Sequence, residues 1–243
     1  MELIKAENIS KDYTAGEVTI RALDGVSFEI EPASFVSFVG PSGSGKTTLL
    51  NLIGCLDKPT EGKLTVADTD ITGLDRKQSA FFRGEHIGFI FQDFNLIPVL
   101  TVYENIEYPL LMVQNVPAKE RQKRVGAVIE AVGMTDQKDK YPDQISGGQK
   151  QRVAVARALV TNPKLVLADE PTGALDSKTG VEIMNLFQGL HNDGGQTVIL
   201  VTHDSFVAHH TNRIIKLSDG HIVSDEINPK PLKAGAVRPD EAA

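Results

Sequence analysis

The chain has 243 residues, of which 41% are hydrophobic and 23% charged, an ordinary balance for a globular protein with a sizeable core. Its apolar runs span only a few residues, far short of the roughly 20 that a membrane-spanning helix needs. The first residues lack the apolar segment of a signal peptide, so we expect a cytoplasmic protein. The net charge of −7 argues against a general nucleic-acid binder, and a single cysteine, Cys55, excludes an intrachain disulfide.

The first thirty residues contain three segments in which apolar and polar residues alternate. This period of two predicts antiparallel strands at 3–9, 18–22 and 26–30, with a turn at 14–16. A short apolar run at 35–39 predicts a buried strand, and residues 46–53 predict a helix.

Between that strand and that helix lies a complete phosphate-loop pattern, G-x-x-x-x-G-K-[ST]. Its glycines allow successive backbone N–H groups to point into one concavity, and the helix N-terminus favours anions. We expect Lys46 to reach the β- and γ-phosphates and the Thr47 hydroxyl to bind Mg²⁺. A chance glycine-rich turn would not need this strand–loop–helix setting, so the sequence predicts binding of a nucleoside triphosphate. The expected contact residues are Gly40, Pro41, Ser42, Gly43, Ser44, Gly45, Lys46, Thr47 and Thr48.

The middle of the chain changes from strand to helix character. After a turn at 57–62, strands are predicted at 63–66 and 87–91. Thr101 and Glu104 have the spacing of a capping box, and Pro117 suits the first turn of a second helix. We therefore expect an inserted helical subdomain at about 93–160.

The last third returns to alternating helices and strands. Helices are predicted from Ser146 to about 159 and at 177–190, and strands at 164–168 and 196–201. A hairpin is predicted around 218–220. The segment 228–243, with three prolines, several alanines and mixed charge, predicts a disordered tail.

Two carboxylates, Asp169 and Glu170, follow the strand predicted at 164–168. A carboxylate at such a strand end, beside a phosphate loop, can hold Mg²⁺ through its hydration shell, and this role suits Asp169. Glu170 would face a water in line with the γ-phosphate and is the natural candidate for its general base. A solvated turn is the alternative, but the phosphate loop favours the functional interpretation.

A second anion-binding surface is expected at the helix that Ser146 begins. Gly147 and Gly148 leave bare backbone N–H groups at its positive end, and Gln149 follows them. This run resembles the signature motif of the ATP-binding cassette (ABC) family, usually Leu-Ser-Gly-Gly-Gln, and it precedes Glu170 by the interval typical of that family.

Four further positions match the family one by one. Gln92 is similar to the Q-loop glutamine, which contacts the metal and water, and Asp176 to the aspartate of the D-loop. His203 resembles the switch histidine near the γ-phosphate. Tyr13 occupies the place of the aromatic residue that stacks on adenine.

Within the family, the chain resembles the LolD and MacB group, the ATPase subunits that pair with lipoprotein-release and macrolide-export permeases. The stretches that carry the likeness are 53–60, 88–98 and 169–176, and the departures, Ile145 and Lys150, are small. The resemblance covers nearly the whole chain.

The resemblance implies an α/β fold over residues 1–227, a P-loop NTPase with a RecA-like core, an N-terminal antiparallel β-subdomain and the inserted helical subdomain. It implies a Mg²⁺-dependent ATPase that dimerises head-to-tail on ATP, each signature closing the phosphate loop of the other copy. An integral-membrane permease would be the other partner, which would place the chain at the inner face of the cell membrane.

Two alternatives stay open at this point. One is a cassette ATPase of DNA repair or translation, although the chain lacks the long heptad insertions of the former and the second cassette of the latter. The other is a regulatory scaffold that signals through a membrane partner, as the cell-division members do; Glu170 and His203 favour turnover over this role. Cargo, transport direction and permease identity are not readable, because substrates of this family contact the permease.

Overall fold

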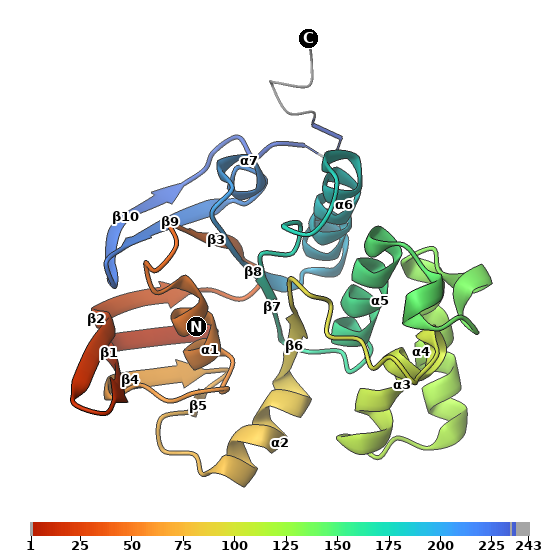
Figure 1. The fold of residues 1–243 in the computed structure, drawn as a ribbon, viewed down its shortest axis with the longest axis horizontal. Helices are drawn as coiled ribbons and strands as arrows, with labels where there is room; N and C mark the ends of the chain where they lie inside the picture. The colour runs from red at the N-terminus through yellow and green to blue at the C-terminus, as the bar shows by residue number, and fades with distance from the viewer. Residues whose placement is uncertain (1, 234, 237–243) are drawn as a thin grey trace.

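The computed structural model describes residues 2–233 and 235–236, which form two sheets with a group of helices beside them (Figure 1). The first sheet is antiparallel and has the strand order β2-β1-β4-β5. Its strands are β1 (Ile4–Ala15), β2 (Val18–Ile30), β4 (Glu61–Val66) and β5 (Thr69–Asp70). This sheet confirms the expected N-terminal β-subdomain.

The sequence predicted two strands where β2 is one continuous strand. Register shifts on β1 between Ala6 and Asp12 accommodate the interruption around Gly25, whose φ is +61°. Such bulges let a strand bend without breaking its pairing. Period-two patterning fails across a bulge, which explains the split prediction.

The second sheet is the mostly parallel core, with the order β10-β9-β3-β8-β7-β6. Only its edge strand β10 runs antiparallel to its neighbour, β9. The strands are β3 (Phe35–Val39), β6 (Ile87–Ile90), β7 (Leu165–Asp169), β8 (Thr197–Thr202), β9 (Arg213–Ser218) and β10 (His221–Ile227). The central strands β7 and β8 are buried almost throughout, because helices or the other sheet cover both faces.

The two faces of this sheet have separate cores. On one face, α1 (Lys46–Ile53) packs between the parallel sheet and the antiparallel sheet. The other face carries α6 (Ser177–Gly194) and the short α7 (Ser205–Ala208), together with one side of α5 (Gly147–Leu159). The parallel strands therefore end between two packed layers.

The helical subdomain lies beside the sheet's β6 edge (Figure 1). It consists of α3 (Val102–Met112), α4 (Ala118–Ala131) and α5, with short 3-10 turns η1 (Thr135–Gln137) and η2 (Pro142–Gln144). The predicted capping box of α3 is present, since Glu104 N donates to Thr101 Oγ1 at 3.2 Å. α5 is shared between two cores: Val153 packs among the subdomain helices and Val155 against the sheet.

Two helices escaped prediction, α7 and α2 (Arg76–His86). α2 is mostly polar and buries only Ser79 and Phe82, so its apolar face is narrow. Its start was visible in the sequence, because Asp75 and Gln78 form a capping box like that of α3.

The tail predicted to be disordered, residues 228–243, makes hydrogen bonds with the rest of the protein in its described part. Asn228 Nδ2 donates to the carbonyls of His209 and Thr211, and Gly235 N donates to Asn185 Oδ1 at 2.9 Å. These backbone and amide groups find partners on α6 and after α7, a possibility that composition does not reveal. The rest of the predicted tail, residues 234 and 237–243, lies outside the described residues.

In the part of the chain that is described, no helix combines the length and the apolar character needed to cross a bilayer.

Candidate active site

Four of the predicted site segments begin where parallel strands end. The phosphate loop follows β3, Gln92 follows β6, Asp169 and Glu170 lie at the end of β7, and His203 follows β8. Since β3, β8, β7 and β6 are parallel neighbours, their carboxyl ends meet at one edge of the sheet. The fold thus brings these segments together.

The phosphate loop has the geometry of an anion cradle. Gly43 and Gly45 adopt left-handed φ values of +81° and +97°, and a Cβ on Gly45 would lie 2.5 Å from Ala22 O. No side chain caps α1 at Gly45, which leaves the first-turn N–H groups available to a ligand. Lys46 Nζ donates to Gly40 O at 2.8 Å and to Pro41 O at 2.9 Å. The buried Ser44 Oγ has no hydrogen-bond partner among the described residues.

Oxygen atoms suited to a magnesium ion lie beside this loop. Thr47 Oγ1 and Asp169 Oδ1 are 3.5 Å apart. Burial, and then the neighbouring Glu170 charge, raise the pKa of Asp169, so a cation here would relieve an unfavourable carboxylate. The described residues contain no cluster of three or more His, Cys, Asp or Glu side chains that could hold a metal. The hydroxyl of Thr47 and the carboxylate of Asp169 nevertheless fit Mg²⁺. This ion keeps several waters and takes one or two protein carboxylates beside substrate phosphates.

Glu170 is held by both its backbone and its carboxylate. Its φ of +45° is left-handed, and its N–H donates to Val201 O at 2.8 Å. Oε1 accepts from His203 N at 2.9 Å and lies 2.8 Å from His203 Nδ1, while Oε2 accepts from the Thr202 hydroxyl at 3.1 Å. The predicted pair Glu170 and His203 is therefore in direct contact, and β8 orients the carboxylate.

Gln92 and Tyr13 are two further residues predicted for the ATP site. Gln92 is exposed, and a Cβ on Gly173 would lie 3.2 Å from its Nε2, so it borders the turn after Glu170. The Tyr13 hydroxyl donates to Asp57 Oδ2 at 3.0 Å. Burial raises the pKa of Tyr13, yet 42% of the residue remains exposed and can receive a flat ring.

The sequence did not predict the residues that hold the Tyr13 ring and the Glu170 carboxylate in place. Lys11 Nζ lies 2.7 Å from Asp57 Oδ1 and 5.0 Å from the centre of the Tyr13 ring, so Lys11 and Asp57 together fix the aromatic side chain. Thr202 does the same for Glu170. The spacing of Lys11 and Tyr13 on one strand was a usable signal, whereas their link to Asp57 is long-range.

The signature residues form the N-terminus of α5. Gln149 N donates to Ser146 Oγ at 3.3 Å, and Ser146 N donates to Gln149 Oε1 at 2.9 Å, which completes a capping box. A Cβ on Gly148 would lie 2.3 Å from Thr179 Cγ2, so glycine allows α5 to approach the start of α6. Asp176 caps α6 through Thr179 N at 3.0 Å.

The signature does not join its own phosphate loop. Among the described residues no hydrogen bond links 146–149 to 40–48, and α5 and α1 lie well apart with β6 and β7 between them (Figure 1). The two surfaces at which the sequence predicts anion binding are therefore separate within one chain.

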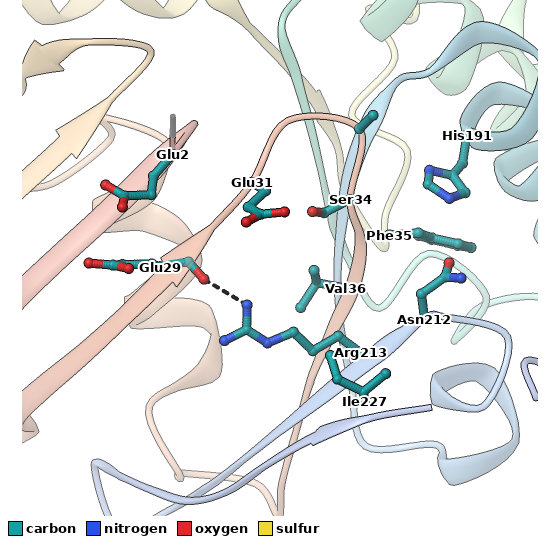
Figure 2. A pocket seen from close by; sticks show the side chains of 11 residues that line it. Glu2, Glu29, Glu31, Ser34, Phe35, Val36, His191, Asn212, Arg213 and Ile227 are labelled. Carbon is teal, nitrogen blue, oxygen red and sulfur yellow. Dashed lines mark hydrogen bonds between the residues drawn. The ribbon is translucent and has the colours of Figure 1, made fainter. Parts of the chain in front are cut away.

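A cavity of about 580 Å³ lies at the opposite edge of the parallel sheet, where β3 begins (Figure 2). Glu2, Glu29 and Glu31 lie on one side of it and His191 on the other. Arg213 donates to Glu29 O and forms an ion pair with Asp225. The residues that line this cavity include none of the predicted site residues.

The comparisons with known proteins agree with this geometry. A family model described as ABC transporter matches residues 23–173. The chain is 48% identical to an uncharacterized ABC transporter ATP-binding protein of Methanocaldococcus jannaschii, MJ0796, over 92% of this chain and 97% of that protein. It is 45% identical to the macrolide export ATP-binding/permease protein MacB of Syntrophobacter fumaroxidans, over 91% of this chain but only 31% of that protein.

Solved structures give the same result. A structure of MJ0796 described as the dimeric post-hydrolysis state bound to ADP and Pi has a TM-score of 0.86 and 46% identity, covering 93% of this chain and 98% of that chain. The likeness in sequence, fold and motif placement leads to one conclusion. The chain belongs to the ABC transporter family and is a Mg²⁺-dependent ATPase of that family.

Proposed function

We propose that two copies of this chain close head-to-tail around ATP and that hydrolysis drives a membrane permease of the lipoprotein-release or macrolide-export type. The observation that carries this proposal is the separation of the signature helix from the phosphate loop of its own chain. A capped but unengaged helix N-terminus favours anions, and the partner's γ-phosphate is the anion it would meet. The dimeric MJ0796 structures support this arrangement.

In this proposal the phosphate loop binds the ATP phosphates through its backbone N–H groups, Ser44 and Lys46. Thr47, Asp169 and Gln92 hold Mg²⁺, which would neutralise charge that develops on the β- and γ-phosphates. Tyr13 stacks on the adenine, while the partner's signature and Asp176 complete the site from the other copy.

Glu170 would activate the attacking water. Its carboxylate accepts the water proton while the water oxygen bonds to the γ-phosphorus and the bond to the β-phosphate oxygen breaks, which yields ADP and phosphate. Thr202 and His203 hold the carboxylate, and His203 is 67% exposed at its side chain, so it can turn toward the γ-phosphate. Release of phosphate then removes the charge that both copies share, and the dimer opens.

The chain spans only about a third of the length of the relatives whose names include a permease, and we propose that the transported substrate meets a permease of that kind. A groove of about 270 Å³ between β6 and the helical subdomain offers a docking site. It is lined by Phe91, Asn95, Pro109 and Arg157, and Arg157 donates to Phe94 O at 2.8 Å, which ties the groove to the segment after Gln92. This contact would place the chain at the inner face of the membrane.

The apolar run at 94–100, directly after Gln92, and Tyr103 are further candidates for this docking surface. Leu96 and Tyr103 pack against the subdomain core, whereas Val99 is 77% exposed and available to a partner. Copurification of the chain with membrane proteins tests the partnership. Recovery of a permease supports it, and recovery of no integral-membrane protein contradicts it.

The experiment for the ATPase site is Glu170→Gln, with Glu226→Gln as a matched control on the exposed surface of β10. The amide still accepts the hydrogen bond from Thr202 but cannot take a proton, so turnover should fall about 10²- to 10⁴-fold. ATP binding should persist, and size-exclusion chromatography with Mg²⁺ and ATP should show a trapped dimer. Turnover like that of the Glu226→Gln control would show that Glu170 is not the base.

A further inference from the structure

A fully buried glutamine lies between the signature and Glu170. Gln151 belongs to α5, which the signature begins, and 0% of it is exposed. Its Nε2 donates to Pro171 O at 2.8 Å. Its Oε1 is buried and has no partner among the described residues. Burial of a half-satisfied amide costs free energy, so core packing alone gives no reason for this residue.

The acceptor of this hydrogen bond is the residue directly after Glu170. Proline at 171 disfavours the α region for Glu170, whose φ is nevertheless +45°. Left-handed backbone at a glutamate persists only when its surroundings hold it. Two of these restraints are Glu170 N to Val201 O at 2.8 Å, and Gly173 N to Glu170 O at 3.0 Å. The hydrogen bond from Gln151 to Pro171 O adds a third restraint, which comes from helix α5.

We propose that Gln151 is a positioning residue that fixes the Glu170–Pro171 turn to the signature helix of the same chain. The inference rests on the proposed role of Glu170 as general base. Gly148 packs closely on Thr179 at the start of the same helix, so α5 has little freedom to move without its neighbours. The backbone that carries the Glu170 carboxylate is therefore held by α5 through Pro171 O, while β8 holds the carboxylate itself. When the signature of one chain binds the ATP held by the partner, it thus fixes the position of Glu170 in its own chain.

The test compares Gln151→Met with Gln188→Met. Both glutamines are buried and donate from Nε2 to backbone carbonyls, Gln151 to Pro171 O and Gln188 to His210 O and Leu232 O. Each substitution removes one donor and leaves similar volume. Because Gln188 makes two such hydrogen bonds and Gln151 one, a purely structural role predicts a loss of melting temperature and of activity in Gln188→Met at least as large as in Gln151→Met.

We expect Gln151→Met to lower kcat by about tenfold to a hundredfold with KM for ATP nearly unchanged, because displacement of a catalytic group by about 1 Å can cost this much. Gln188→Met should keep the kcat of the unmodified chain. In the Glu170→Gln background, Gln151→Met should still form the ATP-trapped dimer, since binding and the signature are intact.

Three outcomes would overturn the inference: unchanged kcat in Gln151→Met, an equal kcat loss in Gln188→Met, or loss of the trapped dimer, which would mean that Gln151 acts by holding the signature. None of these touches the proposed role of Glu170 as general base, which fails if Glu170→Gln itself retains turnover.

Discussion

His210 shows how a single residue can tie stability to pH. It is fully buried after α7, its Nδ1 lies 2.9 Å from Phe206 O, and its ring packs edge-on against Phe206. Burial lowers the pKa of His210 below its ordinary value of 6.5, and this effect outweighs the neighbouring Asp204, which acts in the opposite direction. Its Nε2 has no partner among the described residues, so a proton there would gain no hydrogen bond.

The pH dependence follows from this shift. Below about pH 6.5 the unfolded chain binds a proton at this histidine that the folded chain resists. The contribution of His210 to the free energy of unfolding should therefore be fully present above pH 6.5. It should be lost progressively as the pH falls below that value. His210→Phe should flatten this fall in urea unfolding between pH 7.5 and 5.5, with part retained because the pKa of His86 is lowered too. An unchanged slope would show that His210 does not carry the effect.

The site residues divide according to how local their signals are. The phosphate loop, Asp169 with Glu170, and the signature are contiguous motifs at strand ends or a helix start, so a sequence pattern suffices to predict them. Lys11, Asp57 and Thr202 act through side-chain contacts between segments that are distant in the sequence. No local pattern encodes such contacts, because they depend on which strands and loops the fold brings side by side.

Among the elements, α5 and β6 set the distance between the helical subdomain and the core. A Cβ on Gly88 in β6 would lie 2.4 Å from Ala158 O in α5, so glycine permits the close packing of these two elements. The sequence predicted both elements but not their contact. It also missed α2, a mostly polar helix that buries only Ser79 and Phe82. Strands buried on both faces and helices with apolar stripes were predicted well, because their patterns come from burial itself.

Gly88→Ala should separate α5 from β6 and destabilise the protein by about 1–3 kcal/mol, as overpacking of a core typically does. Gly126→Ala provides the opposite case: nothing lies within 4 Å of its Cβ position in the interior of α4. There alanine should stabilise by about 0.5–1 kcal/mol, because glycine is the poorer helix former. Urea unfolding of both variants measures the difference. Equal effects of the same sign would contradict this account of the packing.

At the scale of the whole molecule, the two predicted anion-binding surfaces of one chain lie apart, and we propose that a second copy completes each of them. The phosphate loop lies at the edge of the parallel sheet, and the signature begins the helix shared with the helical subdomain. The tail adds contacts between α6 and the segment after α7, the elements that follow Asp176 and His203. The central claim is that a working site takes its phosphate loop from one chain and its signature from the other.

Complementation between two inactive variants tests that claim most directly. Lys46→Ala removes the phosphate-loop cation, and Gly147→Asp places a carboxylate at the signature. A Cβ at Gly147 meets only ordinary contacts at 3.7 Å or more, so the fold should tolerate the change. Each variant alone should show little ATP turnover. If sites form between chains, the mixture contains dimers with one complete site, and its turnover should clearly exceed the sum of the separate variants. A mixture that gives only that sum would show that each chain completes its own site, and would contradict the head-to-tail dimer.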